Sequence, residues 1–171
     1  MLDLIAVGGA PGSGKTTVCR LIQDETRWPL IEFGYLRQFH LDKAWTNTSP
    51  REEQMSFENL AFIVRNYVHY GYKHIMVNDL QDFRVQQIPD LFSDIDYIIL
   101  DLIVESDDAL KQRVLDPTRD SGFRDYAASL AWNDRLKRRP LGRNEFRIDN
   151  TDRNPAQAMQ TILQAIEEHE R

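Results

Sequence analysis

Apolar and polar residues form blocks along this chain that have the lengths of strands and helices in turn. The first apolar run covers residues 2–7, contains the β-branched residues Ile5 and Val7, and stops at two glycines. Its length and its abrupt end are typical of a buried strand. Four later runs have the same character, and the strands predicted from them cover residues 30–33, 75–77, 97–104 and 145–148.

The segments between these runs carry apolar residues at helical spacing. Ser49 and Glu52 form a predicted capping box, with Pro50 at the first helical position. The Ser49 hydroxyl is expected to accept from a free amide, and Glu52 to reach back to the cap. Strands that alternate with helices predict an α/β fold with a five-stranded parallel sheet covered by helices on both faces. The predicted helices cover residues 16–26, 34–45, 50–70, 107–115, 125–138 and the residues from 155 onward, with a short helix or turn within 82–92.

The composition bounds the class of protein. A length of 171 residues fits one domain, residues 1–171, and a hydrophobic content of 42% suffices for a core. The longest apolar run is about half as long as a membrane crossing requires, so we expect no membrane partner. The N-terminus lacks the features of a secretory signal and Cys19 is the single cysteine, which together favour the cytoplasm. A net charge of -6 argues against a generally nucleic-acid-binding surface.

One motif carries specific chemistry. Residues 9–16, GAPGSGKT, match the pattern G-x-x-x-x-G-K-[ST] in full, after a predicted strand and before a predicted helix. Glycines in this pattern let main-chain N–H groups converge on phosphate oxygens at the positive end of the helix. Lys15 is then expected to reach the β- and γ-phosphates of a nucleotide, and the Thr16 hydroxyl to bind Mg²⁺. The predicted nucleotide-binding residues are Gly9, Ala10, Pro11, Gly12, Ser13, Gly14, Lys15, Thr16 and Thr17.

With this motif and this order of elements, the sequence resembles the P-loop small-molecule kinases, the nucleoside-monophosphate-kinase-like group that includes adenylate, cytidylate, shikimate and gluconate kinases. The resemblance implies the three-layer P-loop NTPase fold, ATP and Mg²⁺ as cofactors, and a small-molecule phosphate acceptor. It implies an acceptor-binding region of about residues 34–70, in which Arg37 binds an anionic or phosphorylated group, and a basic lid at about residues 116–124. The Asp-Gly-Phe-Pro-Arg segment of adenylate kinases is absent, so the acceptor does not follow from the family.

Three further residues are candidates at the strand ends and on the acceptor side. Asp79 follows the third predicted strand, where ligands bind in open α/β sheets, and is expected to support Mg²⁺ through water; the alternative is a cap of the next helix. Glu32 ends the second predicted strand and is a candidate base for an acceptor hydroxyl, with a solvent-facing strand position as the alternative. Arg84 is a weaker candidate on the acceptor side.

Arginines around the lid-like segment are candidates to stabilise the transferred phosphoryl group. Arg113 precedes this segment, and Arg119 and Arg124 lie in or next to it. The one basic cluster of the chain, in residues 135–143, lies at a predicted helix C-terminus and is interpreted as a solvated helix end, because cations favour that end of the helix dipole. Contact with a nucleotide or with the 5′ end of a nucleic acid is the alternative.

Together these features predict a kinase that transfers the γ-phosphoryl group of ATP to a small acceptor, with Lys15, Asp79, Arg113 and Arg119 as its catalytic residues. Two alternatives stay open: a nucleotide-binding module that hydrolyses slowly and acts through a protein partner, and a kinase for nucleic-acid 5′ ends. A switch GTPase is disfavoured because the chain contains no Asn-Lys-x-Asp guanine motif.

Overall fold

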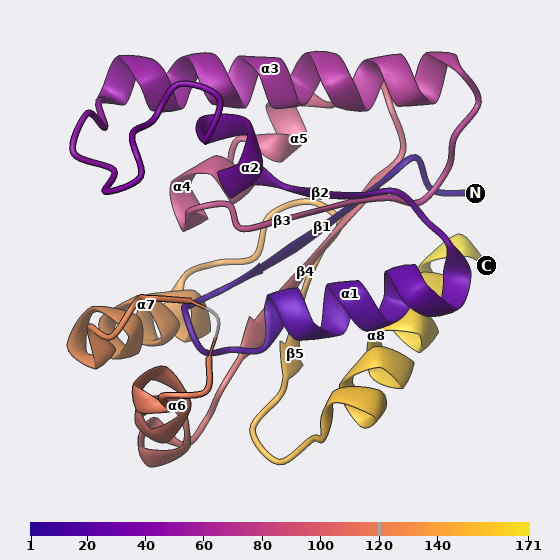
Figure 1. The fold of residues 1–171 in the computed structure, drawn as a ribbon. Coiled ribbons are helices and arrows are strands. Elements are labelled where there is room, and N and C mark those ends of the chain that lie inside the picture. The colour runs from indigo at the N-terminus through magenta and orange to yellow at the C-terminus, as the bar shows by residue number, and fades with distance from the viewer. Residues whose placement is uncertain (120) are drawn as a thin grey trace.

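The computed structural model describes residues 1–119 and 121–171. In this part of the chain five parallel strands form one sheet in the order β2-β3-β1-β4-β5. Helices cover both faces of the sheet (Figure 1), so the three-layer α/β fold predicted from the sequence is confirmed. The strands are β1 (Leu4–Gly9), β2 (Leu30–Glu32), β3 (Ile75–Asn78), β4 (Tyr97–Ile103) and β5 (Glu145–Asp149).

Most predicted helices are present, with bounds that agree to within one or two residues. The predicted segment 82–92 forms two short helices, and Pro89 lies in the first turn of the second, where a missing N–H is tolerated. The helices are α1 (Lys15–Thr26), α2 (Phe33–Arg37), α3 (Pro50–His69), α4 (Asp82–Val85), α5 (Ile88–Leu91), α6 (Asp107–Leu115), α7 (Tyr126–Arg138) and α8 (Pro155–Glu170).

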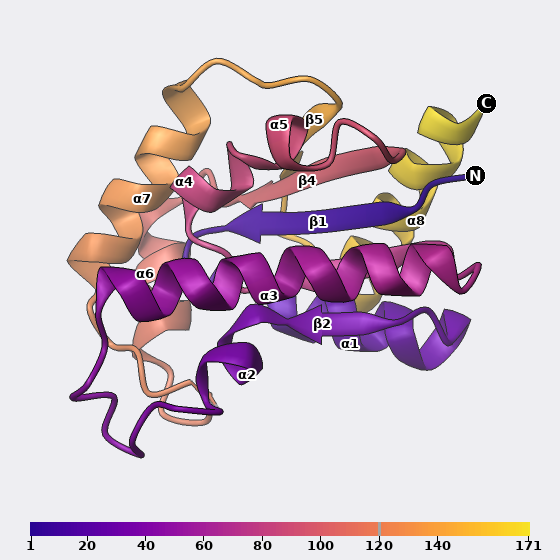
Figure 2. The same cartoon turned by 90° about the horizontal axis from the view of Figure 1, so that it is seen from above.

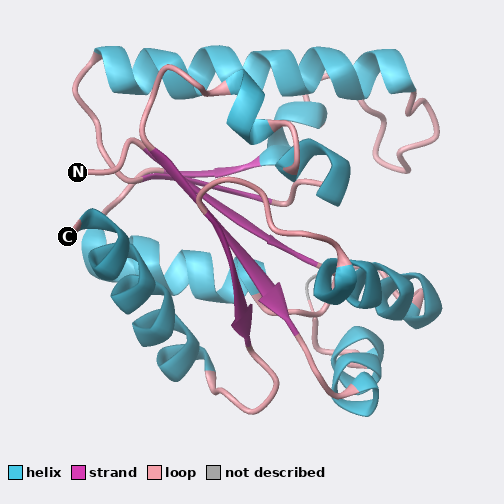
Figure 3. Cartoon of the chain, turned by 180° about the vertical axis from the view of Figure 1, so that it is seen from behind, coloured by secondary structure: helices cyan, strands magenta, loops and turns pink. Residues whose placement is uncertain are grey.

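The central strand β1 is buried on both faces. Leu4 and Ala6 belong to a core shared with α3, α4 and α5, whereas Ile5 and Val7 belong to a core shared with α1 and α8. This explains why β1 has a continuous apolar run instead of an alternating pattern. Because all strands are parallel, their carboxyl ends meet at one edge. At this edge lie the loop that follows β1 and four helices, α2, α4, α6 and α7. Both termini lie at the opposite edge (Figures 1 and 2). From behind, α1 and α8 are seen below the sheet and α3 above it (Figure 3).

The helix predicted over residues 34–45 is wrong beyond Arg37, where α2 ends. Side chains take over the hydrogen bonding of the following backbone. Oδ1 of Asp42 accepts from the main-chain N–H groups of Ala44 (3.0 Å) and Thr46 (2.9 Å), and Oδ1 of Asn47 accepts from that of Asp42 (2.9 Å). Such local side-chain bonds compete with helix formation and hold residues 38–49 as a loop.

The capping box predicted at Ser49 is half correct. Oγ of Ser49 accepts from the main-chain N–H of Glu52 at 3.1 Å, but the Glu52 side chain bonds to Arg37 and does not reach back to the cap. Strand bounds also shift slightly: β1 extends to Gly9 because Gly8 and Gly9 pair with β4, and Phe33 belongs to α2.

Candidate active site

The loop at residues 9–16 joins the carboxyl end of β1 to the first turn of α1, as the motif requires. Gly12 and Gly14 have φ angles of 87° and 100°, which glycine adopts without the steric cost of a side chain. A Cβ would lie 2.8 Å from Cγ2 of Val114 at Gly12 and 2.8 Å from Nδ2 of Asn150 at Gly14. Gly14 is also the N-cap of α1 and supplies no capping side chain, so the first amides of the helix suit an anion.

Lys15 is the first residue of α1, and its side chain folds back over the loop. Nζ donates hydrogen bonds to the carbonyl oxygens of Gly9 (2.7 Å) and Ala10 (2.9 Å). Burial lowers the pKa of Lys15 to about 8, and the negative charge of Asp79 opposes this shift. The ammonium group is thus held at the loop with little water, where phosphate oxygens would stabilise its charged form.

Asp79 follows β3 and lies beside the start of α2. Its Oδ2 accepts from the main-chain N–H of Gly34 at 3.2 Å, and its φ of 64° is in the left-handed region, which costs energy for a non-glycine residue. Although the residue as a whole is exposed, desolvation raises the pKa of its carboxyl above the ordinary value, against the effect of Lys15. The alternative role as a cap is not found for α4, whose N-cap is Gln81.

Thr16 and Asp79 offer a hydroxyl and a carboxylate, the hard oxygen donors that Mg²⁺ prefers. Magnesium in phosphate-transferring enzymes is held by one or two protein oxygens, with substrate phosphates and water completing its octahedron. Thr16 lies in the first turn of α1 next to Lys15, and the charge of Asp79 acts on Lys15, so both donors belong to the phosphate end of the site. The residues present therefore fit a Mg²⁺ ion that arrives with a nucleotide. Among the described residues, no group of three or more His, Cys, Asp or Glu side chains is arranged to hold a metal ion.

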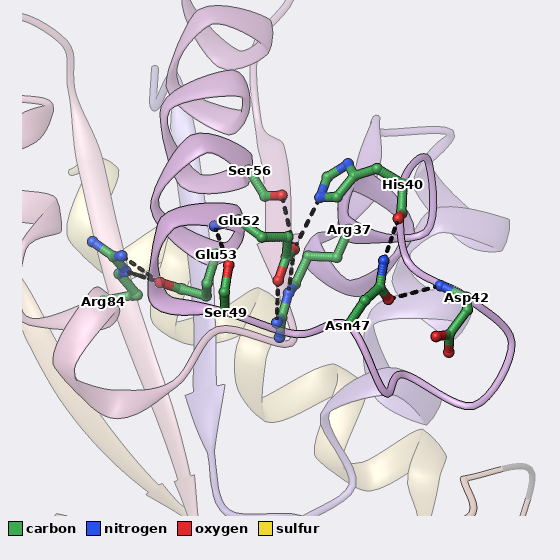
Figure 4. A network of polar contacts seen from close by, with 9 residues as sticks. All are labelled: Arg37, His40, Asp42, Asn47, Ser49, Glu52, Glu53, Ser56 and Arg84. Atoms are coloured by element: carbon green, nitrogen blue, oxygen red, sulfur yellow. Dashed lines mark hydrogen bonds and ion pairs between the residues drawn. The ribbon is translucent and has the colours of Figure 1, made fainter.

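Arg37, at the end of α2, meets the first turn of α3 (Figure 4). Its Nε donates to Oε1 of Glu52 at 2.9 Å and its Nη2 donates to Oε2 at 2.7 Å. Oε1 also lies 3.2 Å from Nε2 of His40 and accepts from Oγ of Ser56 at 3.3 Å, and the Trp45 ring covers the guanidinium. The hydrogen bond from Arg37 lowers the pKa of Glu52 to about 2. Only 14% of the Arg37 side chain and 7% of the Glu52 side chain are exposed, so the predicted acceptor arginine is already occupied by a carboxylate.

The other two predicted acceptor-side residues are also ion-paired. Arg84, in α4, is buried, donates from Nε to Oε1 of Glu53 at 3.0 Å, and stacks on the Phe57 ring. Glu32 accepts from Nε of Arg20 at 3.0 Å. The sequence did not predict Glu52 and Glu53 as the partners of these arginines. The one sequence signal at these positions was the capping box, which assigned Glu52 to the start of the helix.

Of the predicted lid arginines, Arg119 lies close enough to the phosphate-binding loop to act on Lys15. Nη1 of Arg119 donates to the carbonyl oxygen of Val114 at 3.2 Å, and the charge of Arg119 lowers the pKa of Lys15. Arg124 bonds to main-chain carbonyls of its own segment. The structure thus brings Arg119 within electrostatic reach of Lys15. Asp120, in the middle of the predicted lid, lies outside the described residues.

Arg113, in the last turn of α6, bonds to a different segment of the chain. Its Nη2 donates to the carbonyl oxygen of Thr151, in the segment after β5, at 2.5 Å. Of the four predicted catalytic residues, Asp79 and Arg119 each act electrostatically on Lys15, whereas Arg113 bonds to the segment between β5 and α8.

The sequence analysis interpreted the basic cluster in residues 135–143 as a solvated helix end. In the structure, part of this cluster is buried. Arg139 is 14% exposed and meets three carboxylates: Nε donates to Oδ1 of Asp82 (3.0 Å), and Nη2 donates to Oδ2 of Asp101 (2.9 Å) and to Glu145. The expectation was wrong for Arg139 because its partners come from α4, β4 and β5, which a local pattern does not reveal. In the described part of the chain, no helix is both long enough and apolar enough to span a membrane.

No protein-family model matches this sequence. Among curated proteins, the chain is 34% identical over 84 residues to a protein of Pyrococcus abyssi named "Putative adenylate kinase". The match covers 45% of this chain and 45% of that protein, so it spans about half of the relative's length.

Solved structures resemble nearly the whole chain. A sugar kinase from Janibacter sp. HTCC2649 superposes with a TM-score of 0.68 at 17% identity, covering 98% of this chain and 95% of that one. A gluconokinase from Sinorhizobium meliloti 1021 gives 0.67 at 14% identity (96% and 91%), and the thymidylate kinase from Candida albicans gives 0.64 at 15% (98% and 92%). Identities this low speak for the fold alone. The chain therefore has the fold of the P-loop small-molecule kinases and carries their complete phosphate-binding motif.

Proposed function

We propose that this protein is an ATP- and Mg²⁺-dependent kinase that transfers the γ-phosphoryl group to a small, anionic or phosphorylated acceptor. The observation that supports this most strongly is the grouping of Lys15, Asp79 and Arg119 at the carboxyl edge of the sheet, where the charges of the latter two act on Lys15. A phosphate-binding loop alone serves any nucleotide-binding protein. A metal-binding carboxylate and a second cation beside the loop are parts of a phosphoryl-transfer site.

On the nucleotide side, the main-chain N–H groups of residues 9–17, except at Pro11, bind the phosphates, and Lys15 exchanges its two carbonyl partners for phosphate oxygens. Thr16 and Asp79 hold Mg²⁺, which when bound neutralises phosphate charge during transfer. Arg119 adds positive charge beside the transferred group, and Arg113 is the second candidate for this role.

The transfer itself is a substitution at phosphorus. An acceptor oxygen forms a bond to the γ-phosphorus, the bond to the β–γ bridging oxygen breaks, and ADP leaves with that electron pair. A hydroxyl acceptor also releases a proton, which needs a base. Glu32 at the end of β2 and Asp79 after β3 are the two proposed carboxylates.

On the acceptor side, Arg37 is proposed to bind an anionic group. The planar guanidinium binds Glu52 through two parallel hydrogen bonds, which is the geometry that it would use for a carboxylate or phosphate of the acceptor. Acceptor binding then requires Arg37 to exchange Glu52 for the incoming anion. Arg84 is buried against Glu53 and would contribute only after a similar exchange.

A nucleic-acid end has less support as the acceptor. In the cluster of residues 135–143, Nζ of Lys137 lies 3.5 Å from Oε2 of Glu105, and Arg139 is surrounded by three carboxylates. These ion pairs neutralise much of the positive charge that a phosphodiester backbone requires. A small molecule is the acceptor class that this charge distribution favours.

The proposal is tested by incubating the protein with ATP, Mg²⁺ and single acceptors, including nucleoside monophosphates, gluconate and shikimate. ADP release and the mass of the phosphorylated product are measured. Lys15→Ala is expected to lower transfer by about a hundredfold or more, the scale of losing a charge donor to the transition state. ATP hydrolysis that no acceptor accelerates would instead favour the slow nucleotide-binding module, and activity unchanged in Lys15→Ala would contradict the site.

A further inference from the structure

Side chains from distant parts of the chain hold the carbonyl groups of the phosphate-binding loop. Oγ of Ser129, in the first turn of α7, donates to the carbonyl oxygen of Pro11 at 2.5 Å. Nδ2 of Asn150, which follows β5, donates to the carbonyl oxygen of Ser13 at 2.8 Å. The donors lie 118 and 137 residues from their acceptors, so the folded structure alone brings them to the loop.

Both donors are themselves fixed. Ser129 is fully buried, and one turn later Asn133 bonds twice to Val104, accepting from its N–H at 3.0 Å and donating to its carbonyl at 2.6 Å. This attaches α7 to the end of β4. Asn150 is buried, and its main-chain N–H donates to the carbonyl of Ile103 at 2.8 Å. The loop is thereby connected to two strands at the edge where the site lies.

These bonds determine the direction of two amide groups. A peptide unit is planar and trans, so its C=O and N–H point in opposite directions and the position of one fixes the other. The carbonyl of Pro11 shares a peptide unit with the N–H of Gly12, and that of Ser13 with the N–H of Gly14. Both glycines have positive φ, and glycine limits peptide rotation least, so an unrestrained loop would turn these units readily.

We propose that Ser129 and Asn150 are positioning residues that preorganise the Gly12 and Gly14 amides of the loop for the phosphates of a nucleotide. This inference rests on the proposed nucleotide site. Each residue acts through the loop and not by touching the substrate. A ligand that binds the loop therefore does not have to order these amides first, which increases its affinity.

The experiment compares Ser129→Ala and Asn150→Ala with Thr161→Ala as a matched control. Thr161 also donates a hydroxyl hydrogen bond to a main-chain carbonyl, that of Gln157 at 3.0 Å, but within α8. Affinities for ADP and for tripolyphosphate, each with Mg²⁺, are measured by calorimetry well below the melting temperature. Each loop variant is expected to bind both probes about tenfold more weakly, the scale of one lost hydrogen bond, while the affinity of the control is unchanged.

Hydrogen exchange gives a second measure that does not depend on a ligand. Without nucleotide, the peptide covering residues 9–16 is expected to exchange faster in Ser129→Ala and Asn150→Ala than in the wild type. In Thr161→Ala it is expected to exchange at the wild-type rate. A role limited to global stability would change exchange throughout the protein instead. Such a uniform change, or none, would contradict the positioning role.

Lys15→Ala separates this inference from the proposed function. If Lys15→Ala weakens binding of both probes but Ser129→Ala and Asn150→Ala do not, the nucleotide site stands and the positioning role is wrong. If the wild type binds neither probe, or Lys15→Ala changes nothing, the nucleotide site is wrong and the inference is wrong with it.

Discussion

Arg37, at the end of α2, and Glu52, in the first turn of α3, form a two-point ion pair, with Nε 2.9 Å from Oε1 and Nη2 2.7 Å from Oε2. Both side chains are largely buried, and His40 and Ser56 complete the surroundings of the carboxylate. Glu52 thus serves as an internal anion for the arginine that the sequence assigns to the acceptor. An acceptor anion must compete with Glu52 for the same two donors.

This competition predicts the effect of Glu52→Gln. The variant keeps the size of the side chain and removes its charge, so Arg37 is released toward an external anion. We expect the KM for an anionic acceptor to fall by about three- to tenfold, because a charged hydrogen bond no longer has to be exchanged, and the KM for ATP to stay unchanged. Initial rates over a range of acceptor concentrations measure both constants.

Asp94→Asn is the control for this prediction, since Asp94 also accepts two hydrogen bonds from one arginine, Arg65, which is not a candidate for the acceptor. It is expected to leave the acceptor KM unchanged. Arg37→Lys keeps the charge but removes the planar fork, and should raise the acceptor KM. A higher acceptor KM in Glu52→Gln would mean that Glu52 holds Arg37 in its working position, contrary to the competition.

The lowered pKa of Lys15 predicts that nucleotide affinity depends on pH. Burial lowers its pKa from 10.5 to about 8, so the ammonium loses its proton at mildly alkaline pH. Anionic phosphates bind the charged form, so ADP affinity should be constant just above neutrality and fall as the pH rises through about 8. Calorimetric titration with ADP above about pH 7, where the last phosphate proton is mostly gone, measures this. In Lys15→Met the weaker affinity should not vary over the same range.

The same pKa shift affects the stability of the free protein with the opposite sign. Between about pH 8 and pH 10.5 the unfolded chain binds the Lys15 proton and the folded chain does not. The contribution of Lys15 to the free energy of unfolding therefore rises with pH across this range. The stability difference between the wild type and Lys15→Met should follow that rise, and a difference independent of pH would show that Lys15 keeps its proton in the fold.

The sequence was informative wherever the interaction is local. The strand, the loop of residues 9–16 and the helix after it lie within one continuous stretch, so the phosphate-binding site and the parallel α/β sheet could be predicted. The end of α2 at Arg37 could not, because Asp42 captures main-chain amides that the helical pattern had left to a helix. Periodicity records which face is apolar and not which polar side chain takes an amide.

Pairings between distant residues account for the rest. Arg37 and Arg139 were recognised as cations, but the choice between a ligand, solvent or an internal carboxylate depends on elements that meet only in the fold. The sequence contains no signal for the role of Ser129, because a single serine in a helix matches no motif, yet its hydroxyl bonds to the phosphate-binding loop. A site built from one motif is therefore readable from sequence, and a site built from tertiary ion pairs is not.

Asp79→Asn tests the metal-binding role. Asparagine has the same shape, its side-chain oxygen can still accept from the Gly34 N–H, and it tolerates the left-handed conformation at least as well as aspartate. We therefore expect the melting temperature without ligand to change little, while the rate falls about a hundredfold and ATP affinity loses its dependence on Mg²⁺. Loss of stability with an intact Mg²⁺ dependence would show a purely structural role.

Arg139→Met tests whether the carboxyl groups of Asp82, Asp101 and Glu145 depend on one cation. Burial raises the pKa of Asp101 to about 8, so the charges left unpaired near neutral pH are those of Asp82 and Glu145, which should lower the free energy of unfolding by about 3 kcal/mol. Burial alone would raise the pKa of Glu145, but hydrogen bonds, that of Arg139 foremost, lower it to about 2. A lowered pKa stabilises the fold above the ordinary carboxylate value, and this stability is lost as the pH falls toward 2.

The difference in the free energy of unfolding between the wild type and Arg139→Met should therefore be largest near neutral pH. It should shrink below about pH 5, where the unpaired carboxylates of the variant take up protons. Urea unfolding at several pH values measures it. Arg138→Met is the matched control, because Arg138 is 78% exposed and pairs with Asp134 on the surface, so its loss should cost less than about 1 kcal/mol. If this difference in the free energy of unfolding for Arg139→Met is equal at neutral and acidic pH, Arg139 stabilises the fold through the packing of its alkyl chain, because only the charge responds to protonation of its partners.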